Sequence, residues 1–487
     1  MKNIFVMLLL IFCFLIFTFH ASLASSGLQK VVEYNKPSVV LMYMDISGKV
    51  SFSEPLINQR AFKELEAEIT NLAYSGAFGT TEEEVTRNTI RYVLTKMAQN
   101  PNKYLIPSKR VRNVDVSTGA VGTGVIINPN GYILTATHVV AMEEDELRQI
   151  VINKFLLTII SDELFSAFEN EVGVPLSKED EDLLTKMVVG YISSNIVDFK
   201  YEKMIYAGLG VAEKGKSNVT AFFKPANIIK LGSSEKIKDI VDMGRDIAIV
   251  KIDQTNLPTS IIADHEPVEG SEITVIGYPA KVHVFAGALF DNFSILKPTI
   301  TKGIVSAIRT SSKGVRIIQT DATISGGNSG GPAYNNEGKI IGTASWVLVD
   351  PNLGIQTQNY GILVSCSEIQ NFIKEANIQN VQSEVDKNYQ KGIDEYFAQR
   401  YRNAIKYFKK VQDLYPEHPY VKEYIINSQT FIDQGKDKSG LNLDLGGNTA
   451  LILIILGVLF CGGLLFIIAA VGAYFLFFRK KPFAANK

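Results

Sequence analysis

The pattern of hydrophobic and polar positions indicates a β-rich region interrupted by helices. Two short apolar runs, 125–127 and 132–135, flank Pro129-Asn130-Gly131, whose residue types favour a tight turn. Together they predict a β-hairpin. A further apolar run, 247–252, is typical of a buried strand. The pattern therefore predicts a mainly β domain.

The N-terminal hydrophobic pattern is that of an export signal. An apolar run at 4–19 follows Lys2, and Ser22-Leu23-Ala24 supplies the small residues that suit cleavage. We expect a signal peptide at 1–24. The alternative is an uncleaved membrane anchor, because the run is nearly long enough to span a bilayer. Both interpretations export the chain that follows.

The C-terminal pattern predicts a membrane anchor. Residues 449–478 carry no charge, and they exceed the ~20 residues that a spanning helix needs. Arg479–Lys481 follow directly, so the positive-inside rule predicts that the tail 479–487 lies in the cytoplasm. The preceding segment 434–448 is rich in glycine and is expected to be a flexible linker.

Composition narrows the function classes. The 487 residues exceed what one hydrophobic core usually supports, and the net charge of -1 gives no basic footprint, which argues against nucleic acid as a partner. Two of the three cysteines, Cys13 and Cys461, lie in the apolar terminal runs. The remaining thiol, Cys366, cannot form an intrachain disulfide alone, so we expect a plain buried residue.

Three short motifs carry the candidate chemistry. His138 follows the second strand of the predicted hairpin, Asp246 opens the 247–252 strand, and Ser329 lies among glycines in Gly326-Gly327-Asn328-Ser329-Gly330-Gly331. A serine nucleophile needs a base, a group that orients the base, and N–H donors for the developing oxyanion. Glycines around a serine allow tight turns that expose such backbone amides.

The string around Ser329 also fits the G-x-S-x-G elbow of α/β-hydrolases. That fold needs its histidine after the serine, and the candidate there, His418, falls in a helical segment outside the domain. The order His138, Asp246, Ser329 is instead that of chymotrypsin-type enzymes.

These motifs resemble the HtrA/Deg family of trypsin-like serine proteases. The similarity rests on Gly122–Val140, Asp246–Ile252 and Thr320–Pro332, and it extends to Val31–Val40 and Tyr360–Ser365. It implies a protease domain at about 25–376 with a chymotrypsin-like double β-barrel and with no cofactor or metal ion. Trimers are a further expectation of the family.

The resemblance also implies a role for each residue. His138 and Asp246 come from the first barrel and Ser329 from the second, with the active site in the cleft between them. Gly327 and Ser329 supply the oxyanion-hole amides. Thr323 lies at the base of the primary pocket, where enzymes that cut after Lys or Arg carry an aspartate, so basic specificity is not expected.

The remaining predicted pocket residues lie on two strands. Trp346 has two open interpretations, a platform for the substrate backbone or a packed core residue. The predicted pocket walls are Thr343, Ala344, Ser345, Trp346, Tyr360 and Ile362.

Two insertions depart from the family pattern, at about 50–112 and 141–202. Both show apolar residues at helical spacing, and capping boxes open helices at Thr81 and Ser177. Because amphipathic helices must bury their apolar faces, we expect the insertions to pack together as a helical subdomain beside the cleft. That subdomain either controls access to the cleft or is bulk without a catalytic role.

After Ala376 the family usually continues into PDZ domains, and the segment 377–433 is helical instead. Part of it, 385–416, resembles a single tetratricopeptide repeat. One repeat cannot bury its face alone. It is therefore expected to pack on the protease domain, on a further helix at 421–432, or on a protein partner.

The sequence thus predicts a single-pass membrane protein whose extracytoplasmic domain cleaves polypeptides, in particular exported or misfolded proteins. The alternative is a catalytically idle, membrane-anchored sensor or partner-binding protein on the same fold. The intact His138, Asp246 and Ser329 set favours the enzyme, whereas the missing PDZ domain favours the sensor.

Overall fold

The computed structural model of the protein describes residues 27–142, 144–159, 162–210, 222–233, 236–237, 240–241, 244–279, 297–349 and 356–440. The predicted signal peptide at 1–24, transmembrane helix at 449–478 and tail at 479–487 lie outside these ranges. Within the ranges, no helix combines the length and the apolar character that crossing a bilayer requires.

Six antiparallel strands close into the first barrel, in the order β1-β2-β3-β8-β5-β4. Closure removes free sheet edges, and inward-facing side chains such as Met42, Ile133 and Val250 are completely buried. The strands are β1 (Val39–Ile57), β2 (Leu105–Asn128), β3 (Tyr132–Thr135), β4 (Ile196–Gly208), β5 (Phe223–Leu231) and β8 (Ala248–Ile252).

A second closed barrel follows, in the order β10-β11-β14-β13-β12-β9. One hydrophobic cluster contains residues of both barrels, among them Leu41 and Val125 from the first and Val275 and Ile318 from the second. The predicted mainly β fold with two barrels is confirmed. The elements are β9 (Glu272–Gly277), β10 (Thr299–Thr310), β11 (Arg316–Thr320), β12 (Pro332–Tyr334), β13 (Ile340–Val349), β14 (Gln356–Ser365) and the helix α10 (Cys366–Glu375).

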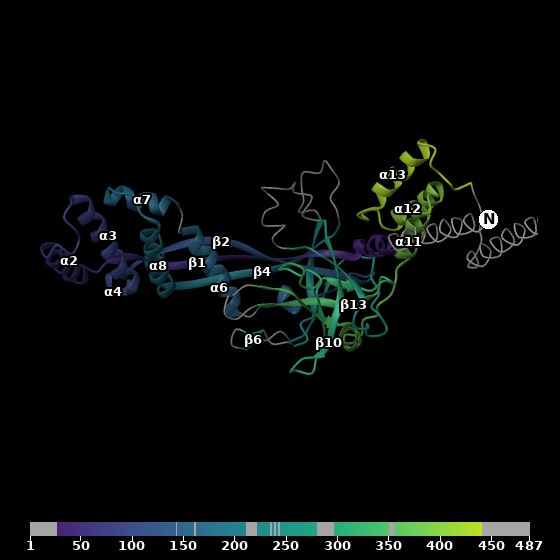
Figure 1. The fold of residues 1–487 in the computed structure, drawn as a ribbon, viewed down its shortest axis with the longest axis horizontal. Helices are drawn as coiled ribbons and strands as arrows, with labels where there is room; N and C mark the ends of the chain where they lie inside the picture. The colour runs from purple at the N-terminus through teal and green to yellow at the C-terminus, as the bar shows by residue number, and fades with distance from the viewer. Residues whose placement is uncertain are drawn as a thin grey trace, which may run out of the picture.

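Strands β1, β2 and β4 continue beyond the first barrel as a three-stranded arm (Figure 1). Strand β1 alone has 19 residues, which corresponds to about 60 Å at ~3.3 Å per residue. The helix α6 (Glu144–Ile159) covers one face of this ribbon, where Phe155 packs with Val50 and Phe52.

Five helices form the tip of the arm, α2 (Gln59–Tyr74), α3 (Glu82–Gln99), α4 (Pro101–Tyr104), α7 (Asp162–Val172) and α8 (Lys178–Ser194). Their shared core joins Leu65 and Leu94 from the first insertion to Leu184 and Met187 from the second. The two insertions therefore bury their apolar faces against each other, and Arg91 Nε contacts the Asp180 carboxylate at 3.0 Å.

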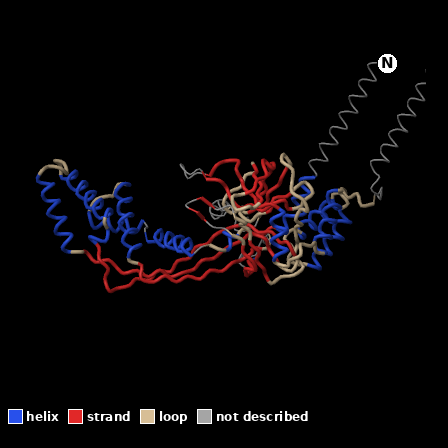
Figure 2. The backbone as a smooth tube through the Cα atoms, turned by 90° about the horizontal axis from the view of Figure 1, so that it is seen from below, coloured by secondary structure: helices blue, strands red, loops and turns tan. Residues whose placement is uncertain are grey.

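The predicted position of these helices beside the cleft is wrong. Figure 2 shows them at the far end of the ribbon, away from the barrels. The reason is that 50–57, 105–112 and 196–202, predicted as parts of helical insertions, continue the barrel strands instead. Alternate residues there, such as Val50 and Phe52, bury against α6, which makes the extended conformation favourable.

Three helices follow α10, namely α11 (Glu384–Phe397), α12 (Tyr401–Leu414) and α13 (Val421–Asp433). Buried residues of α11 and α12 belong to one cluster with residues of the first barrel. Gly392 lets α11 and α12 approach, because a Cβ there would lie 2.5 Å from the Phe408 ring. His418 lies in the turn between α12 and α13 rather than in a helix.

A buried carboxylate joins α11 to the segment that connects the two barrels. Asp386 is 3% exposed and accepts the N–H of Ser383 at 2.8 Å, which completes the capping box of α11. The same carboxylate accepts the N–H of Thr259 at 2.8 Å and the Thr259 hydroxyl at 2.5 Å. The helical segment therefore packs on the protease fold, which is the first of the three arrangements predicted from the sequence.

The arm tip has its own core, which leads to a prediction for Leu94. This side chain is 1% exposed, and Leu94→Ala should cost about 2–5 kcal/mol through the lost contacts and the cavity left behind. Hydrogen exchange should accelerate in α2, α3 and α8 and stay unchanged in the barrels. Tyr74→Ala, at a tip residue 88% exposed, is the control. Equal destabilisation of the barrels would contradict an independent tip.

The buried His418 predicts a pH dependence of stability. It is 4% exposed, accepts the N–H of Tyr420 at Nδ1, and burial lowers the pKa of its imidazole to about 3. In the unfolded chain the His418 imidazole binds a proton below about pH 6.5, whereas in the folded chain it stays neutral down to about pH 3. The stability of the folded state that depends on this neutral imidazole is therefore fully present above about pH 6.5 and is lost as the pH falls toward 3.

At pH 5 the loss should amount to about 2 kcal/mol relative to pH 7.5. In urea unfolding, the stability of the wild type should fall more between pH 7.5 and pH 5 than that of His418→Phe, and the difference should be this amount. His265→Phe changes an exposed histidine and should keep the wild-type pH dependence. A His418→Phe profile parallel to that of the wild type would refute the prediction.

Candidate active site

The first barrel positions two of the three predicted catalytic residues. His138 lies in the short helix α5 (Thr137–Val140), directly after β3, and Asp246 lies just before β8. Because β3 and β8 pair antiparallel, with Thr135 opposite Ala248, the end of one strand meets the start of the other. The two side chains are thereby brought together although they are far apart in the sequence.

His138 and Asp246 form a direct pair. Nδ1 of His138 lies 2.7 Å from Oδ2 of Asp246, and the His138 backbone N–H donates to Oδ1 at 3.1 Å. The aspartate is completely buried, whereas the histidine side chain is 33% exposed. A carboxylate in this position favours the tautomer with a proton on Nδ1, which leaves Nε2 able to accept one.

The second barrel contributes a further donor to this carboxylate. The Ser345 hydroxyl donates to Oδ2 of Asp246 at 2.6 Å. Ala344 and Trp346 pair with the consecutive residues Leu363 and Ile362, so Ser345 is the extra residue of a β-bulge in β13. A bulge redirects a side chain, and here it turns the serine toward the first barrel.

Ser329 lies in the loop between β11 and β12. Its hydroxyl is 3.4 Å from the carbonyl oxygen of Ser345. Gly327 and Gly330 have φ of +95° and +85°, which side chains with a Cβ rarely adopt. Within the described ranges, the N–H groups of Gly327 and Ser329 donate to no backbone carbonyl.

The predicted pocket residues have mixed outcomes. Thr343 and Ala344 are completely buried and Ile362 is 4% exposed, so these three side chains do not line open space in this structure. Thr323 is exposed, and its carbonyl accepts the Thr301 hydroxyl at 3.0 Å.

The other three predicted wall residues are Ser345 and Trp346 in β13 and Tyr360 in β14. Ser345, predicted as a pocket wall, contacts Asp246 instead. Sequence reasoning missed this contact because strand alternation cannot reveal a bulge.

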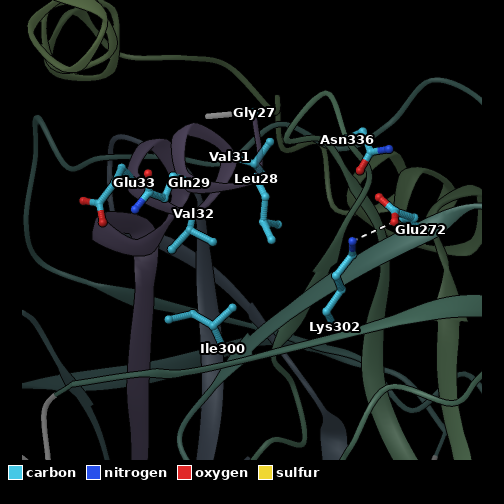
Figure 3. A pocket seen from close by; sticks show the side chains of 10 residues that line it. All are labelled: Gly27, Leu28, Gln29, Val31, Val32, Glu33, Glu272, Ile300, Lys302 and Asn336. Atoms are coloured by element: carbon cyan, nitrogen blue, oxygen red, sulfur yellow. Dashed lines mark hydrogen bonds and ion pairs between the residues drawn. The ribbon is translucent and has the colours of Figure 1, made fainter. Parts of the chain in front are cut away.

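A cavity of about 750 Å³ lies elsewhere, between residues 27–33 and the strands β9 and β10 (Figure 3). Leu28, Val32 and Ile300 contribute its apolar side, and Lys302 pairs with Glu272 at 2.6 Å on the other. None of the residues that line it belongs to the His138, Asp246 and Ser329 set. It is therefore separate from the candidate active site.

The chain is similar to known proteins over part of its length. The family described as "Trypsin-like peptidase domain" matches residues 221–342, a range that contains Asp246 and Ser329 but not His138. The match thus begins after the second insertion and ends inside β13.

Two curated relatives are similar over parts of their length. A "Probable periplasmic serine endoprotease DegP-like" of Halomonas elongata is 37% identical over 111 residues, 22% of this chain and 20% of that protein. "Putative serine protease HhoB" of Synechocystis sp. is 34% identical over 145 residues, 28% of this chain and 30% of that protein. The chain therefore spans about a fifth to a third of the length of these relatives.

Among solved structures, the serine endoprotease from Yersinia pestis matches 72% of this chain and 65% of that chain, at 17% identity and a TM-score of 0.32. Residues 221–342 thus match a trypsin-like peptidase domain, and the chain is similar over part of its length to serine proteases of the HtrA/DegP type.

Proposed function

We propose that this protein is a serine endopeptidase that hydrolyses peptide bonds with Ser329, His138 and Asp246. The observation that carries the proposal is the 2.7 Å contact between His138 Nδ1 and the buried Asp246 carboxylate. Ser345 links this pair to Ser329, because its hydroxyl donates to Asp246 and its carbonyl oxygen lies 3.4 Å from the Ser329 hydroxyl. The serine protease names of the relatives support the same reaction.

In this mechanism the Ser329 oxygen attacks the scissile carbonyl carbon, and Nε2 of His138 takes the hydroxyl proton. Asp246 stabilises the imidazolium, while the N–H groups of Gly327 and Ser329 stabilise the oxyanion. The C–N bond then breaks, and the same proton passes from His138 to the leaving amine. Water, deprotonated by His138, hydrolyses the acyl-enzyme and restores Ser329.

We further propose that the substrates are exported or misfolded proteins at the outer face of a membrane. Support comes from the word "periplasmic" in the name of one relative and from the predicted export signal at 1–24 and anchor at 449–478. The basic residues at 479–481 favour a cytoplasmic C-terminus.

The tetratricopeptide-like helices suit a role as a spacer between the barrels and this anchor. Helices α11–α13 and the arm lie at opposite ends of the long axis (Figure 1). In the proposed topology the helices face the membrane and the arm projects away from it. A protein partner could be recruited only through the parts of α11–α13 that remain exposed.

Replacement of catalytic residues gives the first functional prediction. Ser329→Ala and His138→Ala should each lower casein hydrolysis by about four to six orders of magnitude, because the residues act as a unit. Asp246→Asn should lower it by about four, since it favours the wrong tautomer of His138. Ser312→Ala, at an exposed position, is the control.

A fluorophosphonate probe distinguishes the enzyme from the idle sensor. It should label the wild-type chain and the Ser312→Ala control, and leave Ser329→Ala unlabelled. A folded wild-type chain that is neither labelled nor able to cleave casein would support the catalytically idle reading instead.

The topology predicts a protection pattern. A tag placed after Lys487 should resist protease added to intact spheroplasts, whereas an epitope in the exposed loop at Gly314 should be degraded. Detergent should make both accessible. Degradation of the C-terminal tag with survival of the loop epitope would reverse the proposed orientation.

A further inference from the structure

Thr123 joins the first barrel to the loop that carries Ser329. It lies in β2, is completely buried, and uses every polar group it has. Its backbone N–H donates to the carbonyl of Ser329 at 2.8 Å, and its hydroxyl donates to the carbonyl of Gly327 at 2.7 Å. The same hydroxyl accepts the N–H of Tyr278 at 2.9 Å, and the Thr123 carbonyl accepts the Thr135 hydroxyl at 2.7 Å.

The direction of these hydrogen bonds is determined by the groups themselves. A backbone N–H can only donate, so Tyr278 must use Thr123 Oγ1 as its acceptor. The single hydroxyl proton of Thr123 is then available for the carbonyl of Gly327, which can only accept. Removing the hydroxyl would therefore take a donor from the buried carbonyl of Gly327 and an acceptor from the N–H of Tyr278, which is unfavourable for buried backbone groups.

Both Thr123 contacts reach the backbone that orients the proposed oxyanion donors. The carbonyls of Gly327 and Ser329 lie on the same short segment as the N–H groups of these two residues. Gly327 has φ of +95°, and glycine has more accessible backbone conformations than any other residue. Holding the segment at both carbonyls restricts those conformations and keeps the two N–H groups in place before a substrate binds.

Thr123 and the loop that carries Ser329 are also closely packed. A Cβ on Gly330 would lie 2.1 Å from the Thr123 carbonyl oxygen, and one on Gly331 would lie 3.2 Å from Thr123 Cγ2. The methyl group of Thr123 therefore packs on the loop while its hydroxyl holds Gly327. Shape and hydrogen bonding act on the same segment.

We propose that Thr123 is a positioning residue for the oxyanion hole, which acts by holding the Gly327 and Ser329 carbonyls of the second barrel on the first barrel. The inference rests on the proposed peptidase function and adds to it. Thr123 is buried and does not touch the substrate, so it acts through the loop. Its absence should weaken stabilisation of the transition state more than binding of the substrate.

Two substitutions at the same position separate the hydroxyl from the shape. Thr123→Val keeps the branched shape and loses both hydrogen bonds of the hydroxyl, whereas Thr123→Ser keeps the hydroxyl and loses the methyl. With the full-length chain and a chromogenic peptide ester, Thr123→Val should lower kcat about 10- to 100-fold and change KM less than about threefold. Thr123→Ser should restore kcat to within about threefold of the wild type.

A peptide boronic acid, which forms a tetrahedral adduct with a serine nucleophile, gives the second readout. Its affinity should fall in Thr123→Val by the same factor as kcat/KM and should be nearly normal in Thr123→Ser. If Thr123→Val does not fold, as judged by near-UV circular dichroism, Thr123→Ala is compared with Thr123→Ser in its place.

The outcomes are distinguishable. Wild-type kcat in the hydroxyl-deficient variant, or equal loss of kcat in Thr123→Ser, would overturn the positioning role while the peptidase function stands. A 10- to 100-fold rise in the KM of Thr123→Val with an unchanged kcat would also overturn the positioning role. A folded wild-type chain with no hydrolysis and no labelling by fluorophosphonate would overturn the proposed function and this inference with it.

Discussion

The candidate site depends on one buried charge. Asp246 is completely buried, and an ionised carboxylate in a protein interior is costly unless donors surround it. The first barrel provides the His138 backbone N–H and imidazole, and the second barrel provides the Ser345 hydroxyl. The full set of donors exists only when the barrels are docked. Docking of the barrels and assembly of the site are therefore one event.

The apolar contacts between the barrels are consistent with that constraint. One continuous cluster contains inward-facing residues of both barrels, and burial of such side chains is the main favourable term in folding. Hydrophobic contact has little directionality, so it does not by itself set the register between the barrels to tenths of an ångström. The directional hydrogen bonds of Ser345 and Thr123 contribute to that register, because each joins a residue of one barrel to a residue of the other.

Much of the site could be predicted from the sequence, because it follows from local motifs. His138, Asp246 and Ser329 stand beside strands and turns whose signals are short-range, and the structure brings His138 and Asp246 into contact. The role of Ser345 could not be predicted, since it depends on a bulge defined by pairing with β14. The role of Thr123 depends on a contact 204 residues away in the sequence.

The fold shows the same division between local and distant information. The helices of the insertions were evident from apolar spacing and capping boxes, which are properties of neighbouring residues. Their place at the end of an arm was not, because it requires β1, β2 and β4 to continue pairing far beyond the barrel. Charged residues such as Lys109 and Arg112 interrupt the alternation in β2, and such an edge strand gives a weak sequence signal.

The two ends of the described chain meet at the side opposite the arm. Lys30 contacts the Asp394 carboxylate at 2.7 Å, Tyr34 donates to the same group at 2.6 Å, and Tyr424 donates to Glu33. Each contact is polar, and together they hold residues 27–35 against α11 and α13. From this junction the barrels and then the arm follow along the long axis of the molecule (Figure 1).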